Sequence, residues 1–315
     1  MLDIKGELYE ATADYRRRLG KVFVIDPEAV GNRFDPLHGR YTERQLYASA
    51  KYLLYEAGER DPIFIQRGMK MLTQLFLAAR EENRLAGYEK YRLLPYAGQL
   101  MNLPINQVAA HVQAVSPELV TKFLSGAYDP EKDYDEKKFL TSSWDTATNR
   151  LYPILSDELL RCFDGSDFTA SELMLSPKPV TVYLRLPEAD LEALAPVVRL
   201  FFQTIIHDAI TTYDKRKGSG CFPLLLLLDE AGTGENPAPL RLRDHGCRQA
   251  DQPVGRHSIH QAAGGLRRGK RRDTLGQYRY PNFLPPAPHD CEVPGGGVRP
   301  EIGILPLANE PGRGL

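Results

Sequence analysis

Two adjacent carboxylates, Asp229 and Glu230, directly follow a run of five leucines. Such a run predicts a strand that is buried on both faces, as in the centre of a parallel sheet. Ligands bind at the carboxyl ends of the strands in open sheets of this kind, so both acids are expected at a ligand-binding edge. Burying two neighbouring charges without a use is costly. We therefore predict that this pair carries the chemistry of the chain.

The run matches the Walker B pattern, in which apolar residues precede Asp-Glu. A hard dication prefers oxygen ligands, so Asp229 is expected to bind Mg²⁺, usually through water. Glu230 is expected to polarise the attacking water as a general base. Metal and base together are what phosphoryl transfer needs. The same pattern also occurs in ordinary apolar strands, where Asp229 would only cap the next helix.

The motif that usually holds the phosphates is absent from these 315 residues. No G-x-x-x-x-G-K-[ST] sequence occurs, so neither its backbone N–H groups nor its lysine can cradle the β- and γ-phosphates. The Gly-Ser-Gly segment at 218–220 is better read as a solvent-exposed loop. We expect no ATP hydrolysis by these residues alone.

A third acid, Asp3, ends a short strand near the start of the sequence. Gly6 permits a tight turn, and Glu7–Leu19 has helical apolar spacing. The β-branched strand Lys21–Ile25 follows. This strand–helix–strand order is typical of parallel α/β proteins. Asp3 has two open interpretations, a direct role at a site or simple turn chemistry.

An all-α insertion is predicted over about residues 40–175. Thr42 is expected to cap a helix that runs to about Ala57, and Asp61-Pro62 to begin a helix that runs to about Arg84. Three more helices are expected at 104–115, 116–124 and 132–163, with Pro153 as a candidate break in the last. The α/β part then resumes with a strand, a helix and a strand at 180–186, 187–217 and 222–230.

Composition changes near residue 232, after which Gly, Pro and Arg are abundant and no periodicity persists. One interpretation is a disordered tail. Another is a one-base frameshift between about Gly232 and Pro239, because back-translated codons read in a shifted frame regain apolar patterning in three segments. On that hypothesis the residues from about 235 onward have no evolved fold.

The whole chain has a formal charge of −1 and 42% apolar residues, so its net charge gives no argument for a nucleic-acid partner. Its four cysteines have no metal-ligand spacing. No signal peptide opens the sequence, and the longest apolar run, Phe222–Leu228, is too short to cross a bilayer. These features predict a soluble or peripheral chain without a membrane span.

The motifs LDIKGE, VFVIDPE, VTVYLRLPEADLEALAPVVRLFFQ and LLLLLDEAG occur in this order within residues 1–232. This order resembles the TraG/TraD-like coupling proteins of type IV secretion and conjugative transfer systems. The resemblance implies a RecA/FtsK-like P-loop ATPase that binds Mg²⁺ and ATP and forms a homo-hexamer. It also implies a place on the cytoplasmic side of the bacterial inner membrane, where relaxase-bound DNA is passed to the type IV secretion channel.

The resemblance makes Asp229 and Glu230 the Walker B pair and Asp3 the acidic strand end that follows the Walker A helix, a cofactor-binding position. The family's membrane helices and Walker A loop precede what is Met1 here. We therefore expect an N-terminally truncated, C-terminally frameshifted fragment that is inactive alone and binds neither Mg²⁺ nor ATP tightly. Its expected parts are an incomplete nucleotide-binding domain (1–40 and 176–232), the all-α insertion (41–175) and an aberrant tail (233–315). Two alternatives are a helical adaptor for a relaxase or accessory protein and a non-functional pseudogene product.

Overall fold

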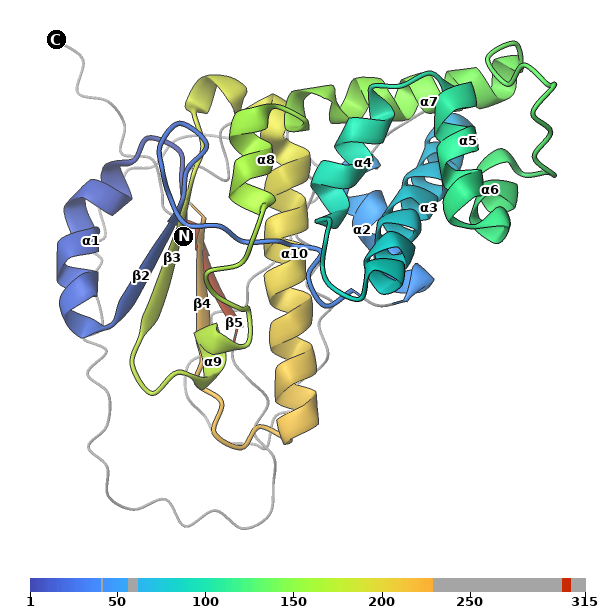
Figure 1. Cartoon of the computed structure of the whole chain (residues 1–315). Helices are drawn as coiled ribbons and strands as arrows, with labels where there is room; N and C mark the ends of the chain where they lie inside the picture. Colours follow the sequence, from blue (N-terminus) through green and yellow to red (C-terminus); the bar gives the residue numbers. More distant parts are fainter. Residues whose placement is uncertain (41, 56–61, 229–301, 307–315) are drawn as a thin grey trace, which may run out of the picture. The chain divides into compact units, whose positions relative to one another are not determined.

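The computed structural model describes residues 1–40, 42–55, 62–228 and 302–306, all within one compact unit (Figure 1). These residues form a parallel sheet with flanking helices and an all-α insertion between its second and third strands. The α/β fold class predicted from the sequence is confirmed, and so is the all-α character of the insertion.

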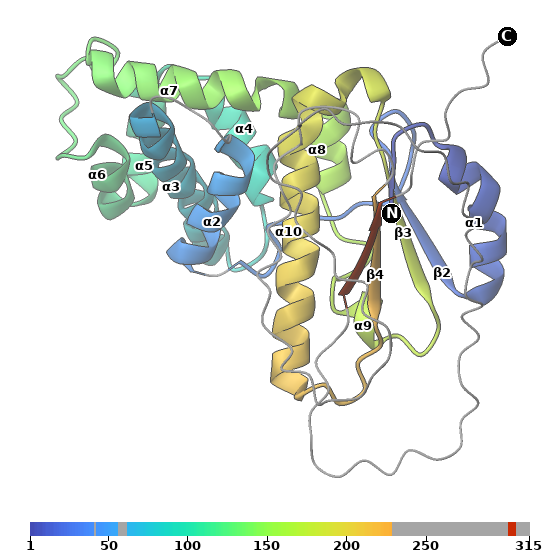
Figure 2. The same ribbon diagram turned by 180° about the vertical axis from the view of Figure 1, so that it is seen from behind.

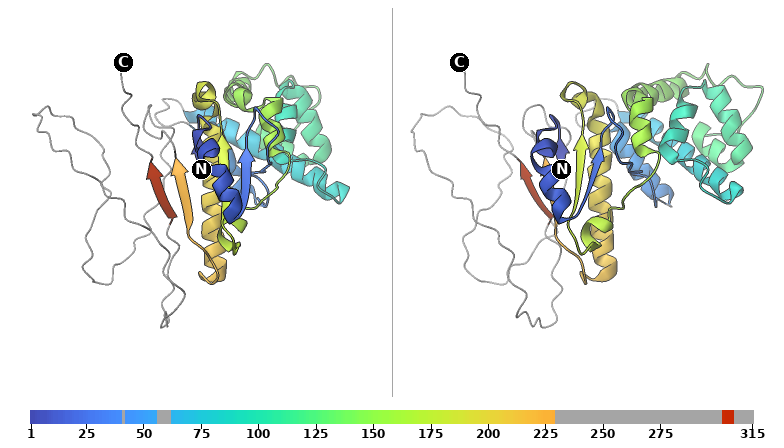
Figure 3. Two further views of the ribbon diagram at one scale, coloured as in Figure 1. Left: turned by 90° about the vertical axis from the view of Figure 1, so that its left-hand side faces the viewer. Right: turned by 60° about the vertical axis from the view of Figure 1, so that its left-hand side comes forward.

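The sheet has strand order β2-β3-β1-β4-β5, and every pair of neighbours is parallel. Figure 3 shows the arrows pointing the same way. The strands are β1 (Leu2–Asp3), β2 (Lys21–Ile25), β3 (Val180–Arg185), β4 (Leu224–Leu228) and β5 (Ile302–Pro306). Four of them were predicted. β4 was expected to continue to Glu230, which lies outside the described residues.

Helix α1 (Glu7–Leu19) covers one face of β3. Thr12 lies 2.7 Å from the Tyr183 hydroxyl, and Arg16 donates to Thr181 at 2.7 Å. Alternate residues of a strand point to opposite faces, so Val182 and Leu184 point to the other one. They share a buried core with Phe201 of α10 (Leu191–Arg216), the long helix that leads from β3 to β4.

The insertion is built around α3 (Pro62–Ala86), which contacts α2, α4, α5, α6 and α7 (Figure 2). Gly68 lets α3 and α7 approach closely, because a Cβ at this position would lie 2.9 Å from the Ala147 Cβ. The remaining elements are α2 (Glu43–Leu54), α4 (Leu93–Met101), α5 (Ile105–Val115), α6 (Pro117–Leu124), α7 (Lys138–Leu151), η1 (Tyr152–Ile154), α8 (Asp157–Phe163), α9 (Glu172–Leu175) and η2 (Glu188–Asp190).

The predicted helix over 132–163 is wrong at its start, since α7 begins at Lys138. The side chains of Asp129 and Asp133 accept the backbone N–H groups of Glu131 and Asp135. Such local bonds compete with a helix. The break at Pro153 is confirmed by η1. The sequence pattern also missed helix α4.

Within the stretch that the frameshift hypothesis leaves without an evolved fold, the structure describes one strand, Ile302–Pro306. This strand pairs with β4 along its whole length, from Leu224↔Ile302 to Leu228↔Pro306. The edge of β4 would otherwise leave backbone N–H and C=O groups unpaired, which favours the addition of a strand. The rest of the tail, and with it the predicted disorder or frameshift, lies outside the described residues.

One stretch among the described helices, Glu188–Arg216, is long and apolar enough to cross a membrane, with a mean hydropathy of 1.3 in its best window. Half of that window is buried inside the fold. Its residues Leu200, Phe201 and Ile205 belong to the core that also contains Leu226 of β4. The contacts of α10 are thus those of a core helix.

Candidate functional site at the carboxyl edge of the sheet

The strand register brings the carboxyl ends of four strands to one edge. Leu2 pairs with both Leu184 and Leu228, and Leu184 also pairs with Ile25. The next residues along three of these strands are polar: Asp3, Arg185 and Asp26. Asp229 and Glu230 follow β4 in the sequence but lie outside the described residues, so their predicted roles stay predictions.

Asp3 has no exposed surface, and its carboxylate accepts hydrogen bonds from the first turn of α1. One carboxylate oxygen accepts the Tyr9 N–H at 2.8 Å, and the other accepts the Leu8 N–H at 3.3 Å. The residue at the N-cap, Gly6, has no side chain that could do this. A negative charge is favourable at a helix N-terminus. The contacts correspond to turn chemistry, and a direct role of Asp3 at a cofactor remains a proposal.

Arg185 carries the positive charge of this edge. Its Nη1 lies 3.0 Å from the Asp26 carboxylate, and its guanidinium lies 5.2 Å from the centre of the Tyr9 ring. Gly6 makes room for it, because a Cβ on Gly6 would lie 2.6 Å from the Arg185 Nη2. Gly6 also has φ +76, a conformation that side chains disfavour. Sequence reasoning missed Arg185, although its place at a strand end was a usable signal.

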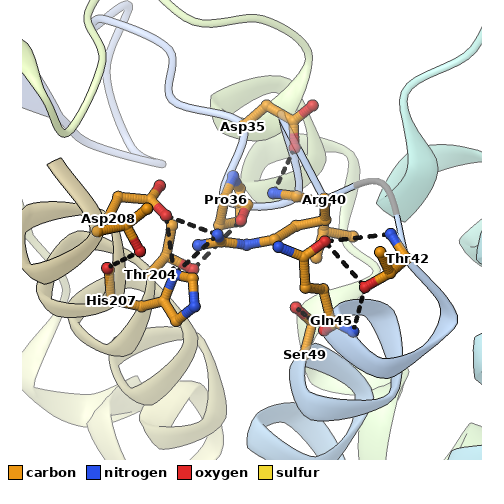
Figure 4. A network of polar contacts seen from close by, with 11 residues as sticks. Asp35, Pro36, Arg40, Thr42, Gln45, Ser49, Thr204, His207 and Asp208 are labelled. Carbon is orange, nitrogen blue, oxygen red and sulfur yellow. Dashed lines mark hydrogen bonds and ion pairs between the residues drawn. The ribbon is translucent and has the colours of Figure 1, made fainter. Parts of the chain in front are cut away.

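A second polar cluster joins the loop before α2 to α10 (Figure 4). Arg40 is buried and donates from Nη1 to Asp208 at 2.6 Å, and the same nitrogen lies 3.1 Å from the His207 Nδ1. Thr204 donates to the Pro36 carbonyl at 3.2 Å. Burial acts to raise the pKa of Asp208, but its hydrogen bond with His207 and the Arg40 charge hold this pKa below its usual value. Sequence reasoning gave His207 no functional role.

Asp35 lies nearby in the same loop and is 3% exposed. Burial raises its pKa from 3.8 to about 6, although its bond from the Leu37 N–H and the Arg92 charge act in the opposite direction. The nearest Arg92 nitrogen is 3.7 Å away, too far for a direct hydrogen bond. Asp35 is therefore a buried acid whose charge is only partly compensated.

The chain matches the family described as type IV secretory system conjugative DNA transfer over residues 1–233. It belongs to this family of type IV coupling proteins. It is similar to Protein VirD4 of Rhizobium radiobacter, with 26% identity over 240 residues that cover 73% of this chain and 33% of that protein. The chain thus spans about a third of the length of that relative.

Two solved structures of the coupling protein TrwB align with 66% of this chain. The sulphate complex of its ΔN70 form shows 11% identity and a TM-score of 0.46, over 44% of that chain. The complex of TrwB with ADP and Mg²⁺ shows 12% identity and a TM-score of 0.46, over 45% of that chain.

Proposed function

We propose that the chain is part of a conjugative coupling ATPase that delivers relaxase-bound DNA to a type IV secretion channel. Membership of the conjugative DNA transfer family supports a role in DNA transfer. The observation that carries the site is the register that aligns the end of β4 with Asp3 and Arg185. Attachment to the cytoplasmic side of the bacterial inner membrane and assembly into a RecA-like homo-hexamer belong to the same proposal.

In this proposal Asp229 holds Mg²⁺ and Glu230 is the general base. The carboxylates at this edge that the structure describes already have partners within the protein, which makes them poor metal ligands. Asp26 is paired with Arg185, and Asp3 accepts two N–H groups of α1. These contacts support Asp229, which follows β4 in the sequence, as the Mg²⁺ ligand. In the same proposal Asp3 belongs to the cofactor site, and its two bonds to α1 fix the start of that helix beside it.

The phosphate cradle is the part that these residues do not supply, since the 315 residues contain no G-x-x-x-x-G-K-[ST]. We propose that they form the metal-and-base half of an ATP site, as a fragment with a frameshifted tail, and do not turn over ATP themselves. Resequencing the gene through the codons for Gly232–Pro239 tests the frameshift. An intact single frame in close relatives would exclude it.

The activity is tested by steady-state hydrolysis of Mg-ATP with the purified chain and its Glu230→Gln variant. The proposal predicts no turnover above a protein-free control for either. ATP turnover by the unmodified chain would contradict the proposal that the chain cannot hold the phosphates. Loss of that turnover in Glu230→Gln would still support Glu230 as the general base.

A second candidate function is a helical adaptor for a relaxase or accessory protein. It is favoured by the insertion, whose central helix α3 has many fully buried residues. Capture of purified relaxase by the chain without nucleotide, unchanged in Asp229→Asn, would support the adaptor. Capture that requires Mg-ATP would support the ATPase role instead.

A further inference from the structure

A cavity of about 580 Å³ lies between α2 and α10, among side chains that the ATPase role does not use. Its volume falls within the range of small-molecule sites. Its lining comes from α2, from α10 and from the loop before α2 (Figure 4). The residues are Arg40, Thr42, Arg44, Gln45, Ala48, Ser49, Tyr52, Gln203, Thr204 and His207.

The lining is polar even where it is most buried. Arg40, Ser49 and Thr204 are 7%, 3% and 4% exposed. Ser49 and Thr204 already donate to the Gln45 and Pro36 carbonyls, so Arg40 is the buried group with further donors for a ligand. Buried polar groups favour a partner that can hydrogen-bond over an apolar one. We therefore expect this cavity to bind a polar ligand rather than an apolar side chain.

The charge of the lining is positive, because the lining includes two arginines but no acid. The nearest carboxylate, Asp208, lies outside the lining and accepts from Arg40 at 2.6 Å. This contact fixes one edge of the guanidinium, whose planar fork carries five donors in all. Arg44 is exposed and makes no ion pair with another described side chain.

We propose that this cavity binds a phosphate group, as inorganic phosphate or a small phosphate ester. Two guanidinium groups, the Gln203 amide and the His207 imidazole surround the space, and the several oxygens of a phosphate can use donors from both sides. A carboxylate has only two oxygens and would leave more donors unused. None of the lining residues lies at the carboxyl edge of the sheet, so the proposal is independent of the ATP site.

The test is isothermal titration of the whole chain with inorganic phosphate, at constant ionic strength kept with chloride. We expect saturable binding that weakens about tenfold in Arg44→Gln, since a hydrogen bond to a charged group has about that effect. Arg18→Gln is the matched control, an exposed arginine on α1 that should leave the affinity unchanged. Gln203→Ala probes the α10 side and should also weaken binding.

Three results would contradict phosphate binding in this cavity. The first is a phosphate response no larger than that of chloride. The second is an equal loss in Arg44→Gln and Arg18→Gln, which would show a general charge effect. The third is binding of single-stranded DNA through Arg44 without any binding of inorganic phosphate, which would make this surface a nucleic-acid contact instead. Circular dichroism of each variant separates lost binding from lost fold.

Discussion

Helix α3 of the insertion and strand β4 of the sheet are both rich in apolar residues but differ in how well they are covered. Leu72, Leu75 and Phe76 of α3 have no exposed surface. Leu225 of β4 is 53% exposed, and Phe222 just before the strand is 50% exposed. Helix α3 is therefore enclosed by the hydrophobic core, whereas β4 keeps exposed side chains although it pairs with β1 and β5. The best-packed helix and the strand that precedes the proposed site thus lie in different regions of this chain.

The largest expected effect tests this difference in burial. Phe76→Ala should lower the free energy of unfolding by about 3–5 kcal/mol, because it leaves a cavity in a packed core. Leu225→Ala should lower it by less than about 1 kcal/mol, since half of that side chain already contacts water. Urea unfolding followed by circular dichroism measures both. Equal losses would show that β4 is as well packed as α3.

The loop between the two regions should make stability depend on pH through Asp35. Its pKa is raised from 3.8 to about 6, so the folded chain holds this proton more tightly than the unfolded chain. Stability should then fall as pH rises from about 4 to 6, by up to about 3 kcal/mol. Asp35→Asn removes the buried charge but keeps an acceptor for the Leu37 N–H.

Unfolding of Asp35→Asn should therefore require more urea than that of the unmodified chain at pH 8, with a difference that shrinks toward pH 4. Asp145→Asn is the control, because Asp145 is exposed on α7. A difference that stays constant from pH 4 to pH 8 would show that Asp35 does not titrate in this range.

A smaller effect is expected at the carboxyl edge of the sheet. Asp3→Asn should lower stability by about 1 kcal/mol, because an uncharged side chain caps α1 less well. Hydrogen exchange of the Leu8 and Tyr9 amides should become faster, while exchange in the insertion stays unchanged. Unaltered exchange at Leu8 and Tyr9 would contradict the capping role.

Local signals in the sequence predicted much of this fold. Thr42 was expected to cap α2, and it forms a capping box with Gln45. The β-branched run Lys21–Ile25 was recognised as a strand with the bounds it has in the structure. Each of these features depends on neighbours within a few residues, which is why the pattern alone was sufficient.

The features that were missed depend on distant residues. Arg40 and Asp208 are 168 positions apart, so no spacing rule joins them. Arg185 gains its partner only when β2 and β3 pair. Strand β5 gains its place from the open edge of β4 rather than from any periodicity of its own region. The roles of Asp229 and Glu230 remain predictions from the sequence pattern.

The most direct test of the account is Mn²⁺ binding to the purified chain, followed by electron paramagnetic resonance. Mn²⁺ takes the oxygen ligands that Mg²⁺ takes. We expect weak Mn²⁺ binding that is lost in Asp229→Asn and retained in Asp145→Asn. Identical binding by Asp229→Asn and the unmodified chain would contradict a metal site at the end of β4, and with it the proposed ATPase half-site.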